Sequence, residues 1–203
     1  MHEETLAKST KVLLDKLSKV SWLSDFYLAG GTGLALQIGH RISVDLDFFT
    51  EKEFNEIDLI SKLSSIGDLE VIQRSSQSIT GTLDEVKFSF LGYKYPILNS
   101  CMEHNGVRIA SIEDIACMKL DALSSRGTKR DFIDLYFIAK KIPMTSILEL
   151  FEQKYATVKY NMMHIKKSMV YFDDTKDDPT PNMIIPVEWE DIKKFFAEQV
   201  VNL

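Results

Sequence analysis

The sequence predicts an α+β fold, in which a mixed sheet with flanking helices is followed by a helical C-terminal portion. Residues 26–49 read as strand, glycine turn, helix and strand, and residues 69–90 contain three more strand-like runs. Beyond residue 111, apolar residues recur at helical spacing. We therefore expect an α/β core over residues 1–108 and a helical portion over residues 109–203 that packs on it.

Composition places the chain among ordinary globular proteins. Of its 203 residues, 45% are hydrophobic and 27% are charged. No stretch approaches the roughly 20 apolar residues of a membrane span, and the acidic start lacks the apolar run of a secretory signal. Cys101 and Cys117 lack the spacing of a metal site. We expect a cytoplasmic protein with reduced cysteines and no membrane partner.

The charges are unevenly distributed along the chain. The formal net charge of −6 argues against a broad nucleic-acid-binding surface. Residues 119–141, however, carry six basic residues against three aspartates, whereas residues 171–203 carry eight acidic residues against three basic ones. The basic segment is suited to a triphosphate or an RNA end, although a solvated helix face is the usual result of such a run.

The first quarter of the chain predicts a helix and then the strand–turn–helix–strand unit. Apolar residues follow helical spacing over residues 5–20, which predicts a helix packed behind the sheet. Residues 26–29 form a short apolar strand, and the helix after the glycine turn opens at Thr32 and breaks at Gly39. Residues 44–49 form the next strand.

A helix over residues 57–66 leads into the three strand-like runs. These cover residues 69–73, 78–83 and 86–90, and residues 84–85 are predicted to form a hairpin turn. The last run alternates apolar and polar residues, as a half-buried strand does.

Short strands or extended segments at residues 93–98 and 107–109 precede the helical portion. A helix begins after Ser111, which a carboxylate follows three residues later as in a capping box, and another covers residues 129–140. The remaining elements are three helices over residues 145–155, 161–171 and 187–200, and an acidic loop over residues 173–181.

Asp45 and Asp47 lie two residues apart in the predicted strand, so both carboxylates project from one face of it. Two such anions repel each other, and a divalent cation removes the conflict. Mg²⁺ takes one or two carboxylates together with substrate phosphates, and Mn²⁺ suits the same oxygen ligands. The pair therefore predicts a metal site, although Asp-x-Asp is also common on solvated strand faces.

The glycine turn predicts a phosphate site. Backbone N–H groups at Gly30 and Gly31, before a helix, are free of side chains and can bind phosphate, and the Thr32 hydroxyl can contact it or cap the helix. Arg41 could face the nucleotide, and Ser43 could bond backbone beside the carboxylate pair. A phosphate site and a metal site on neighbouring strands indicate phosphoryl or nucleotidyl transfer, although a glycine pair is most often only a turn.

Two sequence blocks resemble the AbiEii/AbiGii family of nucleotidyltransferase toxins, a minimal branch of the polymerase-beta-like superfamily. The first block comprises residues 30–36 (GGTGLAL) and 40–49 (HRISVDLDFF). The second, residues 119–136, is similar to the family's helical Lys…Arg…Lys-Asp…Asp-Leu motif, with Arg130 inserted before the first aspartate of the pair. The resemblance spans about residues 26–140 and implies a polymerase-beta-like core.

The resemblance also implies a function. A nucleotidyl group would pass from a nucleoside triphosphate to a hydroxyl of an RNA, such as a tRNA 3′ end, or of a protein. The protein would be the toxin of a toxin–antitoxin pair, with an antitoxin as partner. Lys119 would contact the triphosphate, with a solvated lysine as the alternative. Arg126, at a turn beside Gly127, could clamp phosphate through its planar fork or cap the preceding helix.

One departure from the superfamily pattern puts turnover in question. A third carboxylate is expected from the strand at residues 86–90, where the outward positions hold Lys87 and Ser89. The hairpin carboxylates or Asp134 could substitute for it, although Asp134 is also suited to an ion pair. A catalytically impaired module that binds nucleotide or a partner protein is therefore the alternative function, and a metal-dependent phosphohydrolase is a third.

Overall fold

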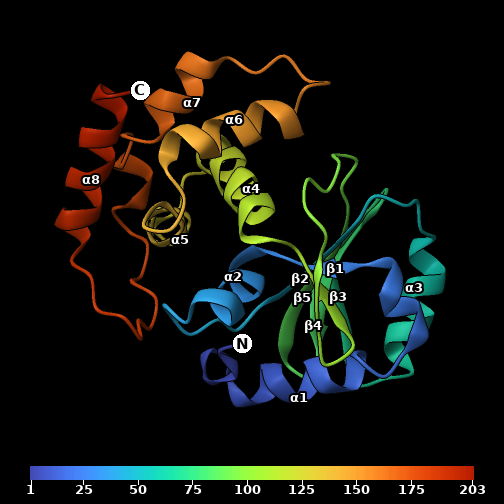
Figure 1. Ribbon diagram of the computed structural model, residues 1–203. Coiled ribbons are helices and arrows are strands. Elements are labelled where there is room, and N and C mark those ends of the chain that lie inside the picture. The colour runs from blue at the N-terminus through green and yellow to red at the C-terminus, as the bar shows by residue number, and fades with distance from the viewer.

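One mixed sheet organises the molecule, and helices cover both of its faces (Figure 1). The computed structural model describes all 203 residues. The seven strands lie in the order β3-β4-β5-β2-β1-β7-β6. Their bounds are β1 Tyr27–Leu28, β2 Leu46–Thr50, β3 Leu69–Ser75, β4 Ser78–Leu83, β5 Val86–Gly92, β6 Met102–His104 and β7 Val107–Ile109. The predicted α+β class is confirmed.

The helices divide between two hydrophobic cores, one on each face of the sheet. α1 and α3 pack on one face, and α4 to α8 pack on the other. Side chains of β1 alternate between the faces, since Leu28 belongs to the first core and Tyr27 and Ala29 belong to the second. The helix bounds are α1 Lys8–Leu17, α2 Gly30–Ile38, α3 Glu56–Ser64, α4 Ile112–Ser125, α5 Lys129–Ala139, α6 Met144–Lys154, α7 Met162–Ser168 and α8 Trp189–Val201. None of these helices has the length and apolar character needed to span a membrane.

The central strands bring the two sequence blocks toward one edge of the sheet. β2 runs antiparallel to β1 and parallel to β5, with Asp47 opposite Ser89. Helix α2 leaves β1 directly, and the Ala29 N–H donates to the Asp47 carbonyl oxygen at 3.0 Å. This bond ties the glycine turn to the strand that carries the carboxylate.

Several local predictions are confirmed by the backbone. Gly39 ends α2 in the left-handed region, with φ of 72°. The Ser111 side chain accepts a hydrogen bond from the Asp114 N–H at the start of α4. Asp84 and Glu85 both have positive φ and join β4 to β5 in a two-residue hairpin.

Other predictions differ from the structure at element boundaries. α2 begins at Gly30 rather than Thr32, and β2 begins at Leu46, so Asp45 precedes the strand instead of lying within it. Residues 93–98 form no strand, whereas β6 was not predicted. An Asn105-Gly106 turn with positive φ at both residues joins β6 to β7, which is the usual hairpin signal.

Candidate active site

A cleft of about 450 Å³ opens between the sheet and helices α4 and α5. Its sheet side carries Gly30, Gly31 and Asp47, and its helix side carries Lys119 and Arg126. The first of the two sequence blocks supplies one side and the second block supplies the other. Residues more than 70 positions apart in the chain therefore line one space.

Asp47 lies directly against the glycine turn. Gly30 has φ of +59°, and a Cβ built on it would be 2.6 Å from the Asp47 Oδ2 atom. Any other residue at Gly30 would therefore carry both a strained backbone and a clash with the carboxylate. The missing side chain gives the carboxylate room beside the first N–H groups of α2, which have no acceptor within the helix.

The surroundings of Asp47 fit a bound cation. Burial raises the pKa of this carboxyl above its ordinary value, and the negative charge of Asp45 raises it further. The Ser89 hydroxyl, Lys119 and Arg126 oppose the shift without reversing it. A divalent cation between Asp45 and Asp47 would remove the repulsion and favour the ionised form of both.

The third carboxylate of the superfamily pattern is replaced by a hydroxyl. Ser89 lies opposite Asp47 on the parallel strand β5, and no group of three His, Cys, Asp or Glu side chains in the chain is arranged to hold a metal ion. Asp45 and Asp47 would therefore hold a Mg²⁺ ion together with phosphate oxygens and water, which is a common ligand set for this ion.

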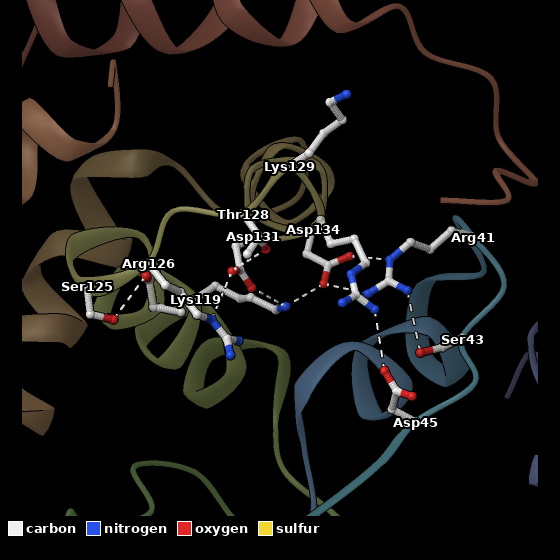
Figure 2. Close-up of polar contacts among 12 residues, drawn as sticks. Arg41, Ser43, Asp45, Lys119, Ser125, Arg126, Thr128, Lys129, Asp131 and Asp134 are labelled. Atoms are coloured by element: carbon white, nitrogen blue, oxygen red, sulfur yellow. Dashed lines mark hydrogen bonds and ion pairs between the residues drawn. The ribbon is translucent and has the colours of Figure 1, made fainter. Parts of the chain in front are cut away.

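Asp45 is the more accessible member of the pair. Its side chain, labelled in Figure 2, is 31% exposed. Its Oδ2 atom lies 3.4 Å from Nη1 of Arg130 on α5. Its backbone carbonyl oxygen accepts a hydrogen bond from the buried Thr32 hydroxyl. The Thr32 hydroxyl also lies 2.8 Å from the Ser43 Oγ atom. Thr32 and Ser43 therefore bond inside the protein and fix Asp45 relative to α2, and neither lines the cleft.

Arg41 is buried behind the glycine turn rather than in the cleft. Its guanidinium packs so closely on Gly31 that a Cβ there would clash with it. Its Nε and Nη2 atoms donate to the two carboxylate oxygens of Asp134 at 2.7 and 2.8 Å (Figure 2). This bidentate pair joins α2 and the loop after it to α5.

Asp134 is the acceptor for three cationic or hydrogen-bonding side chains. Besides Arg41, the Lys119 Nζ atom lies 2.6 Å from it and the His40 Nε2 atom lies 2.7 Å from it. Burial alone would raise the pKa of Asp134, but the charges of Lys119 and Arg41 outweigh burial and hold the pKa well below its ordinary value. Asp134 is thus an ion-pair residue, and it does not line the cleft.

Lys119 is buried, so the alternative of a solvated lysine is wrong. Its Nζ atom lies 2.9 Å from Asp131 as well as 2.6 Å from Asp134. Burial disfavours its charge, but the two carboxylates outweigh burial and raise its pKa. Lys119 therefore stays protonated at the edge of the cleft, where its charge also acts on Asp47.

Arg126 faces solvent at the mouth of the cleft. Its side chain is 67% exposed, and its one ion pair is a 3.4 Å approach of Nε to Asp131. Asp131 in turn accepts a 2.7 Å hydrogen bond from the Thr128 hydroxyl. The two terminal nitrogens of Arg126 are left available for a ligand.

Some members of this network were not assigned to the site from sequence. His40, in the loop after α2, and Asp131, in the first turn of α5, are both buried and bonded to the network. The spacing of Asp131 and Asp134 was the available signal, because residues at i and i+3 share one helix face. The hairpin carboxylates do not substitute for the third carboxylate, since Asp84 pairs with Lys16 at 2.7 Å at the start of β5.

Comparison with known proteins places this arrangement in a family. The family model for the nucleotidyl transferase AbiEii toxin of type IV toxin–antitoxin systems matches residues 11–99 and 95–202. The uncharacterised protein aq_aa25 of Aquifex aeolicus (strain VF5) is 36% identical in an alignment of 201 residues that covers 96% of each chain.

Solved structures share the fold at low sequence identity. A candidate nucleotidyltransferase from Helicobacter pylori superposes with a TM-score of 0.58 at 20% identity, covering 99% of this chain and 92% of that one. The antibiotic-resistance factor ANT(2″)-Ia superposes with a TM-score of 0.53 at 13% identity, covering 77% of this chain and 96% of that one. With the family match over nearly the whole chain, these findings lead to one conclusion: the chain belongs to the AbiEii nucleotidyltransferase toxin family.

Proposed function

We propose that this protein transfers a nucleoside monophosphate from a nucleoside triphosphate to a hydroxyl group of an RNA, such as a tRNA-like end, or of a protein. The observation that carries the proposal is the position of Asp47, which lies against Gly30 in a cleft whose opposite side carries Lys119 and Arg126. The Asp47 carboxylate, free N–H groups for phosphate and fixed cations face one another there, whereas Asp45 lies just outside the residues that line the cleft.

Each group has a proposed role in this reaction. Asp45 and Asp47 hold Mg²⁺ or Mn²⁺, which neutralises the carboxylates and phosphates when bound. The N–H groups at Gly30 and Gly31 bind phosphate oxygens. The acceptor oxygen forms a bond to the α-phosphorus, the bond to pyrophosphate breaks, and the hydroxyl proton passes to water.

The fixed cations stabilise the leaving group. The carboxylates around Lys119 hold its ammonium in place before substrate binds. Arg126 contributes a second charge from the mouth of the cleft. Positive charge already oriented toward the departing pyrophosphate lowers the barrier without reorganisation during the reaction. Arg41, Ser43, Thr32 and Asp134 support this site from behind by positioning α2 and Lys119.

One observation favours a second candidate function. Ser89, not a carboxylate, lies beside Asp47, so activation of the acceptor by a second metal lacks an evident ligand. A module that binds nucleotide or a partner protein without turnover would need only the residues already described.

A labelling experiment separates these functions. The protein is incubated with each α-³²P-labelled triphosphate, Mg²⁺ or Mn²⁺, and total bacterial RNA or protein. Label is followed into the acceptor fractions, and released pyrophosphate and inorganic phosphate are measured separately by enzyme-coupled assays. We expect label in an acceptor and release of pyrophosphate, both lost in a folded Asp47→Asn variant. Transfer that survives Asp47→Asn contradicts the proposal, nucleotide binding without transfer supports the binding module, and release of inorganic phosphate indicates a phosphohydrolase.

We also propose that this transfer makes the protein the toxin of a toxin–antitoxin pair in the cytoplasm. Expression in a bacterial host should then arrest growth, and expression of the Asp47→Asn variant at the same level should not. Equal growth arrest by both proteins would show that toxicity does not depend on the cleft.

A further inference from the structure

A second hollow adjoins the cleft on the far side of Arg126. It has a volume of about 350 Å³ and lies between the C-terminal end of α4 and helix α7. Ser125 and Arg126 line both spaces. A molecule that reaches into the cleft can therefore continue into this hollow past Arg126.

The hollow is lined by positive charge that the protein does not neutralise. Lys167 is exposed on α7 and forms none of the chain's ion pairs, and Arg126 has only its 3.4 Å approach to Asp131. The His164 Nε2 atom lies 3.1 Å from the Ser124 carbonyl oxygen, so this nitrogen carries the proton and donates it there. Lys167 and Arg126 are thus available to an anionic ligand.

The other lining groups match the remaining parts of a nucleotide. Tyr171 is 53% exposed and presents an aromatic ring, on which bases of any sequence can stack. Asp174 supplies a carboxylate of the kind that accepts hydrogen bonds from ribose hydroxyls. Cations for a phosphate, a ring for a base and a carboxylate for a sugar therefore line one hollow.

The same pattern continues beyond Tyr171. This residue also lines a third hollow, of about 510 Å³, between the chain after α7 and helix α8. Lys129 and Trp189 line it, with the Lys129 Nζ atom 5.6 Å from the centre of the Trp189 ring and hydrogen-bonded to the Asp178 carbonyl oxygen at 2.7 Å. The lysines here are thus bonded within the protein, unlike Lys167. The cleft and the two hollows thus form a row in which cations and aromatic rings recur, which we call the α7 track.

We propose that the α7 track binds the single-stranded end of an RNA acceptor, with its terminal hydroxyl in the cleft and the preceding nucleotides along Arg126, Lys167, Tyr171 and Trp189. This rests on the proposed function and narrows its acceptor to RNA. Cations followed by aromatic rings suit a strand that carries phosphates and unpaired bases. The whole chain carries a net charge of −6, and part of the row belongs to the acidic segment 171–203. We therefore expect only a few nucleotides to bind, mainly beside Arg126 and Lys167.

The test measures binding of a fluorescent RNA pentanucleotide by anisotropy, over a range of salt concentrations. Lys167→Glu reverses one charge on the track, and Lys8→Glu makes the same change at an exposed lysine on α1, at the opposite end of the molecule (Figure 1). We expect Lys167→Glu to weaken binding about tenfold and to flatten the dependence of log affinity on log salt by about 0.7, the value for one phosphate contact on a single strand. Lys8→Glu should match the wild type.

A second pair of variants separates stacking from charge. Tyr171→Leu should weaken binding about tenfold without changing the salt dependence, because it removes the ring and no charge. Tyr171→Phe keeps the ring and should bind like the wild type. Circular dichroism checks that each variant is folded, and the Lys167→Ala variant replaces Lys167→Glu if the charge reversal unfolds the protein.

Several results would overturn the α7 track. The first is wild-type RNA affinity in both Lys167→Glu and Tyr171→Leu, and the second is a loss of affinity in Lys8→Glu equal to that in Lys167→Glu. The third is binding of a free mononucleotide as tight as that of the pentanucleotide, because the hollow would then be a site for a single nucleotide. Transfer to protein acceptors at the same rate in wild type and Lys167→Glu would contradict it as well. These results differ from those expected if the proposed function itself is wrong. In that case the wild type would show neither stabilisation by Mg²⁺ and triphosphate nor transfer to any acceptor.

Discussion

Asp47 combines burial with a neighbouring carboxylate, and both disfavour its charge. Its pKa is raised by burial first and by Asp45 second. A residue that only supported the fold would gain nothing from this position, because the ionised form lowers the stability of the free protein. A bound cation would offset the cost of burying this charge and its repulsion by Asp45. The position therefore favours metal binding over a purely structural role.

Asp47→Asn should therefore abolish transfer without lowering stability. Because the pKa of Asp47 is raised in the folded state, the metal-free protein loses stability as the pH rises from the ordinary carboxyl pKa toward the raised one. We expect the variant, without metal, to unfold at the same or a higher temperature than the wild type. Asp45→Asn, at a side chain that is 31% exposed, should show a smaller gain. A clear loss of stability in metal-free Asp47→Asn would contradict this account.

Asp134 has the opposite electrostatic character. Burial is outweighed by Lys119, Arg41 and hydrogen bonds, so its pKa lies well below the ordinary value of 3.8. Its contribution to stability is then complete above about pH 4 and is lost as the pH falls from there toward the lowered pKa.

Asp134→Asn should lower the free energy of unfolding by about 3–5 kcal/mol at pH 7, because it leaves buried cations short of a charged partner. Urea unfolding measures the loss, and Asp84→Asn, which breaks an exposed pair with Lys16, serves as the control with a loss of at most about 1 kcal/mol. Below pH 4 the gap between wild type and Asp134→Asn should narrow. A gap that stays constant down to pH 2 would show that the charge of Asp134 does not stabilise the fold.

At the scale of elements, the glycine turn determines how β1, α2 and β2 meet. Gly30 adopts positive φ and touches the Asp47 carboxylate, while Gly31 makes room for Arg41. The two glycines thus bring opposite charges close to the start of one helix, Asp47 on the cleft side and Arg41 on the buried side.

Gly30→Ala should lower stability by about 1–2 kcal/mol through the left-handed backbone of a residue with a Cβ, and further through its clash with the Asp47 carboxylate. It should also abolish stabilisation by Mg²⁺ and triphosphate. Gly106→Ala is the control for the backbone cost, because Gly106 has φ of +77° in the turn between β6 and β7, away from the cleft. It should lose stability through the backbone and keep the response to ligand. Thermal unfolding with and without ligand compares the two, and a normal ligand response in Gly30→Ala would argue against the turn as part of the site.

The sequence predicted the elements well where the signal is local. Alternation of apolar and polar residues predicted which side chains of β5 point into the core. Gly39 predicted the end of α2 and Ser111 the start of α4, and the structure confirms both. The same alternation identified Ser89 as an outward residue, and the register with Asp47 supports that reading. Boundaries were less accurate, since β6 has only three residues and depends on pairing with β7.

The charge network could not be predicted from local patterns. His40 and Arg41 lie 94 and 93 residues from Asp134, and their contacts depend on how α5 packs on α2. Lys119 illustrates the difference, since helical periodicity placed it beside the apolar stripe, where a lysine is usually solvated. Only the two aspartates on the neighbouring helix make its burial favourable.

At the scale of the whole molecule, the predicted boundary after residue 108 falls inside β7, which lies between β1 and β6 in the sheet. The second hydrophobic core also crosses this boundary, because Tyr27, Leu34 and Ile38 pack with the C-terminal helices. We propose that the chain has two portions in sequence that fold as one unit.

A fragment of residues 1–108 should accordingly fail to fold alone. It would expose the face of the sheet and of α2 that the C-terminal helices cover, and it would leave Arg41 without Asp134. Circular dichroism and urea titration should show no cooperative transition for the fragment and a single transition for the intact chain. A fragment with a sharp transition and native-like helix content would contradict this.

The central claim is that Asp45, Asp47 and the glycine turn form a site for a metal-bound nucleoside triphosphate. Thermal unfolding of the wild type and of the Asp45→Asn/Asp47→Asn double variant, with each of the four triphosphates and with or without Mg²⁺, tests it most directly. At a hundred times its dissociation constant, a bound ligand should add about 2.7 kcal/mol of stability. The account predicts a Mg²⁺-dependent shift with at least one triphosphate in the wild type and none in the double variant. The absence of any shift in the wild type, or an equal shift in both proteins, would contradict it.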